Sequence, residues 1–110
     1  MPWAGVHAQR HSLNQLAAAL TAQGWTVSLR VNGRMPLLRV CAPALPIVGE
    51  SISVRPRGRS RRLWFYSSNG TPISPCHDLP TAVRQVGELM TPCRLVAERF
   101  AQPDKAAEAS

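Results

Sequence analysis

An Asn-Gly pair at positions 32 and 33 separates two apolar runs, and this arrangement is the strongest short-range sign of a β-hairpin. Both residues tolerate the positive φ angles of a type I′ turn, so a two-residue loop is expected at Asn32 and Gly33. Such a loop places Val31 opposite Arg34. Residues 25–41 are therefore predicted to form two antiparallel strands, whose register decides which side chains are buried.

Side chains alternate between the two faces of a strand, so this register divides the hairpin into an apolar face and a mixed face. The apolar face, expected to be buried, holds Trp25, Val27, Leu29, Val31, Leu38 and Val40. The mixed face holds Thr26, Ser28, Arg30, Met35, Leu37, Arg39 and Cys41. Both strands agree on the apolar face, and a slip of one residue would destroy this agreement.

Two apolar stripes with helical spacing lie on either side of the predicted strands. They predict helices over residues 12–23 and 79–90. Ser12 and Asp78 are suitable N-caps, and Gly24 supplies the positive φ that ends the first helix. Pro92 either kinks the second helix or begins a separate last helix.

The stretches between the helices predict short strands and tight turns. After the hairpin, strands are expected over residues 50–55, 62–68 and 71–73. Residues 42–49 contain two prolines and are expected to form an extended connection. The organisation expected is a flexible lead-in over residues 1–10, a single α+β domain over residues 11–101 and a disordered tail over residues 102–110.

The order helix, strands, helix predicts a two-layer α+β fold. Short turns favour an antiparallel sheet of four to five strands with both helices packed on one face. The other face is then open to solvent or to a partner. A third arrangement, in which the C-terminal helix crosses that face and makes it core, is also compatible with the pattern.

The charge balance favours association with an anionic partner. The chain of 110 residues has twelve arginines, one lysine and six acidic residues, which give a net charge of +7. Such a balance is typical of proteins that bind nucleic acid or an acidic partner. Abundant Arg, Ala and Pro with almost no Lys is also typical of a GC-rich genome, and this alternative interpretation stays open.

Five arginines surround one predicted turn and form the first candidate binding site. They are Arg55, Arg57, Arg59, Arg61 and Arg62. Guanidinium groups bind phosphates through two parallel hydrogen bonds, so this tip can bind a polyanion. A solvated hairpin tip that keeps the protein soluble is the alternative interpretation.

The run Leu63 to Tyr66 is aromatic-rich on both faces of its strand, so one pair of side chains must point away from the core. If Leu63 and Phe65 are buried, Trp64 and Tyr66 join Arg30 and Arg39 on the mixed face. Aromatic rings among arginines can stack the bases of a single strand. A partner protein or a second copy of the chain would cover the same apolar groups equally well.

No arrangement of side chains in the sequence predicts catalysis, a metal site or a cofactor. His7 and His11 have the spacing of two zinc ligands on one helix face, but no further ligands accompany them. Cys76 precedes the second helix, where a thiol can have a lowered pKa, and it is a minor candidate nucleophile beside His77. The chain has no apolar run long enough to span a membrane and no signal-peptide pattern, so a cytoplasmic protein is expected.

Two functional hypotheses follow from these patterns. In the first, the protein is a small non-enzymatic interaction or regulatory module that binds a protein partner, or its own copy as a homodimer, through the open sheet face. In the second, it binds DNA or RNA through the arginine-rich tip and the neighbouring Trp64 and Tyr66.

Overall fold

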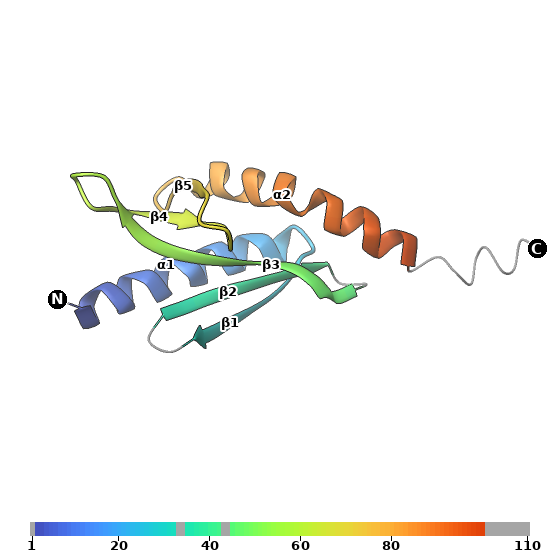
Figure 1. Ribbon diagram of the computed structural model, residues 1–110, viewed down its shortest axis with the longest axis horizontal. Helices are drawn as coiled ribbons and strands as arrows, with labels where there is room; N and C mark the ends of the chain where they lie inside the picture. The colour runs from blue at the N-terminus through green and yellow to red at the C-terminus, as the bar shows by residue number, and fades with distance from the viewer. Residues whose placement is uncertain (1, 33–34, 43–44, 101–110) are drawn as a thin grey trace, which may run out of the picture.

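The computed structural model describes residues 2–32, 35–42 and 45–100 (Figure 1). In chain order the elements are α1 (Pro2–Ala22), β1 (Thr26–Asn32), β2 (Met35–Ala42), β3 (Leu45–Arg57), β4 (Arg62–Tyr66), β5 (Pro72–Pro75) and α2 (Leu79–Phe100). The strands form one antiparallel sheet in the order β1-β2-β3-β4-β5. The α+β class and the antiparallel sheet are therefore confirmed.

Both helices contribute to a single core on one face of the sheet. Its fully buried large side chains are Leu13, Leu16 and Leu20 of α1, Val86 and Met90 of α2, and Leu38, Val40, Ile52, Val54 and Phe65 of the strands. Burial of each such side chain stabilises the fold by roughly 1.5–3 kcal/mol. Because α2 joins this core, the alternative in which it crosses the opposite face is wrong.

The register of the first hairpin differs by two residues from the expected one. Asn32 lies opposite Met35 and Val31 opposite Pro36. Gly33 of the predicted turn lies outside the described residues. A slip of two residues leaves each side chain on its own face, and the hydrophobic pattern therefore cannot separate the two registers. The observed register pairs Val27 with Val40 and Leu29 with Leu38.

Helix α1 begins at Pro2, ten residues before the expected start at Ser12. The helix covers the residues that were expected to form the flexible lead-in. Proline is favourable at the first helical position because its missing N–H needs no partner there. Ser12 lies inside the helix with 8% of its surface exposed, so it is part of the packed face and not a cap.

Helix α2 continues through Pro92 and ends at Phe100, so residues 91–100 are not a separate helix. Of the two alternatives for Pro92, the separate last helix is wrong, and local sequence could not decide between them because it does not include tertiary packing. Met90 and Ala97 are both buried, one on each side of Pro92. Packing against the rest of the core at both positions offsets the hydrogen bond that proline cannot donate.

Strand β3 is longer than expected, and it joins the two halves of the sheet. It begins at Leu45, within the stretch expected to be a connection. Its first part pairs with β2 as far as Ile52, and its last part, Ser53 to Arg57, pairs with β4. Arg55 and Arg57, near the end of β3, therefore lie beyond the part of the strand that pairs with β2.

Candidate functional site

Alternate residues of β1 to β4 form the face of the sheet that points away from the helices. Arg39 lies opposite Ser28 and Ser51, and Arg55 lies opposite Trp64, which sets these side chains on one surface. We call this surface the open face; it consists of Ser28, Arg30, Met35, Leu37, Arg39, Ser51, Ser53, Arg55, Arg57, Trp64 and Tyr66. None of these side chains is acidic.

The side chains of Leu63 to Tyr66 adopt one of the two arrangements that the sequence left open. Phe65 is fully buried, and Leu63 is half-buried against the core. Trp64 and Tyr66 alternate with them and therefore lie on the open face, where each is half-buried. The open face thus holds two large aromatic rings beside four arginines.

Each of the two outer rings is covered by a guanidinium group. The Cζ atom of Arg55 lies 4.3 Å from the centre of the Tyr66 ring, and that of Arg57 lies 4.8 Å from the centre of the Trp64 ring. Both pairs are diagonal neighbours across β3 and β4, a geometry that long side chains reach readily. Such cation–π contacts contribute roughly 0.5–1 kcal/mol at exposed sites and favour a position of each guanidinium over its ring.

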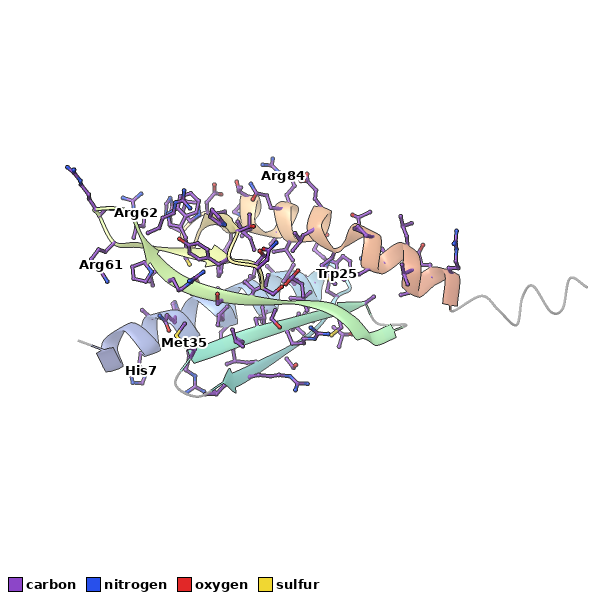
Figure 2. The ribbon with its side chains drawn as sticks, viewed as in Figure 1. His7, Trp25, Met35, Arg61, Arg62 and Arg84 are labelled. Carbon is purple, nitrogen blue, oxygen red and sulfur yellow. The ribbon has the colours of Figure 1, made fainter. Side chains whose placement is uncertain are left out.

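The turn between β3 and β4, together with the first residue of β4, carries the remaining arginines of the predicted tip. Gly58 and Arg61 both have positive φ, at 73° and 54°, and the N–H of Arg61 donates to the Gly58 carbonyl at 3.2 Å. Arg59, Arg61 and Arg62 are exposed. Figure 2 shows Arg61 and Arg62 at this end of the molecule, and Arg84 on α2. The structure therefore brings the five arginines of the run together.

The two arginines of the first hairpin share the open face with this tip but lie on β1 and β2. Arg30 is exposed, with its Nε 3.4 Å from the Ser28 hydroxyl oxygen. Arg39 is half-buried on the neighbouring strand. All nine residues that the sequence analysis selected thus lie on the open face or on the turn at its end.

A groove of about 600 Å³ lies on the open face, and the sequence analysis missed it. Its lining residues are Met35, Leu37, Ser51, Ser53, Arg55, Ser67, Ser68, Asn69 and Gly70. Residues 69–70 lie between two strands that the sequence predicts, but they come to border the groove only because β3 pairs first with β2 and then with β4. The sign of a small-residue surface in the sequence is the pair of alternate serines on β3, Ser51 and Ser53.

Cys76 lines a second cavity of about 560 Å³, together with Ser12, Gln15, Arg62, Leu63 and His77. Burial raises the pKa of the Cys76 thiol to about 11, although a hydrogen bond with Ser12 acts in the opposite direction. The expected lowering of this pKa is therefore wrong, because desolvation exceeds any effect of the helix end. Cys76 is protonated at neutral pH and is a poor nucleophile.

The neighbouring acidic residue has a structural explanation as well. The Asp78 carboxylate accepts the backbone N–H of Thr81 at 3.4 Å and so caps α2. Hydrogen bonds from the Thr81 side chain and backbone lower the pKa of Asp78. The Asp78 carboxylate is therefore engaged with the first turn of α2.

Ionisation of Cys76 is expected to make the folding stability depend on pH above about 9. The unfolded thiol ionises near its ordinary pKa of 9.0 and the folded thiol near 11, so the unfolded state loses its proton first as the pH rises. The contribution of the neutral buried thiol is complete below pH 9 and is lost between about 9 and 11. Urea unfolding at pH 8 and 10.5 is expected to show a larger loss for the native chain than for Cys76→Ala. Equal losses would contradict the raised pKa.

The described residues contain no metal site and no membrane-spanning helix. No three His, Cys, Asp or Glu side chains come together within residues 2–32, 35–42 and 45–100. Over the same ranges, neither helix is long and apolar enough to cross a bilayer. No protein-family model, curated protein or solved structure matches the chain, so its function must be argued from the open face.

Proposed function

We propose that the protein is a small non-enzymatic module that binds nucleic acid on the open face and the adjoining arginine-rich turn. One observation carries this proposal. Arg55 and Arg57 lie over the rings of Tyr66 and Trp64, next to the arginine-rich turn, on a face that has no acidic side chain.

The geometry of these pairs suits a ligand that has both phosphates and flat bases. A guanidinium stacked on a ring keeps its other face and its N–H edges available. The edges can donate to phosphate oxygens, and the free face can stack a base. Because Arg55 and Arg57 are held by their rings, less side-chain entropy is lost when the ligand binds.

The charge of the whole face points to the same class of ligand. Arg30, Arg39, Arg55 and Arg57 spread positive charge across the strands, and the exposed arginines of the turn extend it. A surface of one sign attracts a polyanion over distances of about 10 Å at moderate salt.

Self-association through the open face is less well supported by the same side chains. The apolar side chains on the mixed face of the hairpin suggested a surface that a partner covers. Of these, Met35 is 38% exposed and Leu37 is half-buried. Two copies packed face to face would bring their arginines against each other, and like charges in contact oppose association. The nucleic-acid hypothesis is therefore the one that we put to the test.

The test is a fluorescence anisotropy titration of the full chain with labelled oligonucleotides of about 12 nucleotides, a length within the usual site sizes. Affinity is expected to fall steeply as salt rises from about 50 to 200 mM, because binding releases cations from the phosphates and added salt opposes this release. The emission of Trp64 is expected to change with the same midpoint, since Arg57 covers its ring. No binding at the lower salt concentration would refute the proposal.

A further inference from the structure

We infer that the groove on the open face is a pocket for an unpaired base, so that the ligand of this module is single-stranded. This inference rests on the proposed function and specifies its substrate class. It is carried by the position of the groove next to the Arg55–Tyr66 pair and by the residues that line it.

The groove has a floor of small side chains and two different walls. Ser51 and Ser53 of β3 form the floor. Met35 and Leu37 of β2 form an apolar wall on one side, and the turn of residues 67–70 forms a polar wall on the other. Its volume of about 600 Å³ is within the range of small-ligand pockets, which typically combine apolar walls with a few polar groups.

The groove exists because β3 changes its pairing partner at this point. Ile52 is the last residue that pairs with β2, and Ser53 is the first that pairs with β4. The end of β3 therefore leaves β2 after Ile52, so Ser53 has no partner on β2. Larger residues at Ser51 or Ser53 would fill the groove.

The polar wall is held in place by its own hydrogen bonds. The Ser68 N–H donates to the Glu50 carboxylate at 2.9 Å, and the Thr71 N–H donates to the Asn69 side-chain oxygen at 3.3 Å. Gly70 has a φ of 84°, as a turn of this kind requires. Glu50, the carboxylate nearest the groove, accepts the backbone N–H groups of Ser51 and Ser68 and does not line the groove.

These groups match the chemistry of an unpaired base. Hydroxyl and amide side chains read the hydrogen-bonding edge of a base, which a single strand exposes. The Arg55 guanidinium borders the groove as a flat surface on which the base can stack. In a duplex the base edges are paired and the rings are stacked on one another, so a base cannot enter without being extruded.

The experiment compares three probes of equal length: a single-stranded oligonucleotide, the same backbone with abasic sites in place of its bases, and a duplex. The abasic strand keeps the phosphates and removes the groups that the groove would bind. The intact single strand is expected to bind at least about tenfold more tightly than the abasic strand. It is also expected to bind more tightly than the duplex.

Two variants test whether the preference for intact over abasic strands arises in the groove. Ser53→Leu adds bulk to the groove floor and is expected to abolish the difference between intact and abasic strands, while affinity for the abasic strand stays. Thr91→Leu adds bulk to the exposed side of α2, away from the open face and outside the groove, and is expected to keep the difference. Circular dichroism checks that both variants fold.

The outcomes separate this inference from the proposed function. Equal binding of intact and abasic strands by the native chain would overturn the base pocket and leave nucleic-acid binding intact. A preference that persists in a folded Ser53→Leu variant would place base recognition elsewhere and overturn the inference. Binding of none of the three probes would refute the proposed function itself.

Discussion

Gly49→Ala is expected to lower the free energy of unfolding by about 3 kcal/mol or more, which would be among the largest effects of any single methyl group in this chain. A Cβ atom at this position would overlap the carbonyl oxygen of Val40 and lie 3.1 Å from the Cα and Sγ atoms of Cys41. Gly49 lies directly opposite Cys41 in the β2–β3 pairing. The obstacle is backbone of a central strand, which cannot rotate away as a flexible side chain can.

Gly87→Ala is the matched control, because it adds the same methyl group in the middle of α2. No atom outside the local helix backbone lies within 4 Å of the Cβ that it would introduce. Alanine restricts the unfolded chain and favours helix, so this variant is expected to be about 0.5–1 kcal/mol more stable than the native chain. Urea unfolding followed by tryptophan fluorescence measures both changes. A Gly49→Ala variant as stable as the native chain would show that β2 and β3 do not approach so closely.

The division of the strands into two faces is the part of the fold that alternation could predict. Leu38 and Val40 are buried and Arg30 is exposed, because a period of two residues is a property of any strand. Val31, which was expected on the buried face, is 62% exposed at the end of β1. The same period of two residues explains the error in the hairpin. A slip of two residues changes every cross-strand partner and leaves every face as it was, so periodicity contains no information that would distinguish the two registers.

The element boundaries depended on packing that local sequence does not contain. Pro92 was interpreted as either a kink or the start of a separate helix, and residues 42–49 as an extended connection. Helix α2 continues to Phe100, and strand β3 already begins at Leu45. Ser12 was likewise predicted to cap the first helix, but its side chain forms a hydrogen bond with Cys76, which lies far from it in the sequence. Each local preference amounts to a few kcal/mol at most and is smaller than the burial of a core face.

The residues of the candidate site also differ in whether the sequence could predict them. The arginine run and the aromatic pair were visible because they are close in sequence, and a hairpin brings such residues together whatever its details. The groove was not visible, because it combines β2, β3 and the turn of residues 67–70, and it opens only where β3 exchanges partners. Residues of this kind become neighbours through topology, and no spacing in the sequence marks them.

The double variant Arg55→Gln with Arg57→Gln is expected to weaken binding of a single-stranded oligonucleotide at least about 30-fold. Each arginine is placed by its ring to contact one nucleotide, and one such contact contributes roughly 1–3 kcal/mol. Two contacts at the lower limit amount to about 2 kcal/mol, which is a factor of about 30 in Kd. The slope of log affinity against log salt is also expected to fall by about 1.4, because two phosphates are no longer neutralised on a single strand.

Arg84→Gln with Arg99→Gln is the control that separates local contacts from net charge. Both arginines are exposed on α2, which packs on the opposite face of the sheet, and the variant loses the same two charges. If Arg55 and Arg57 bind the ligand directly, this control keeps its affinity to within a few-fold. If both double variants weaken binding equally, the positive charge acts only as a diffuse field, and the two arginine–aromatic pairs have no specific part in binding.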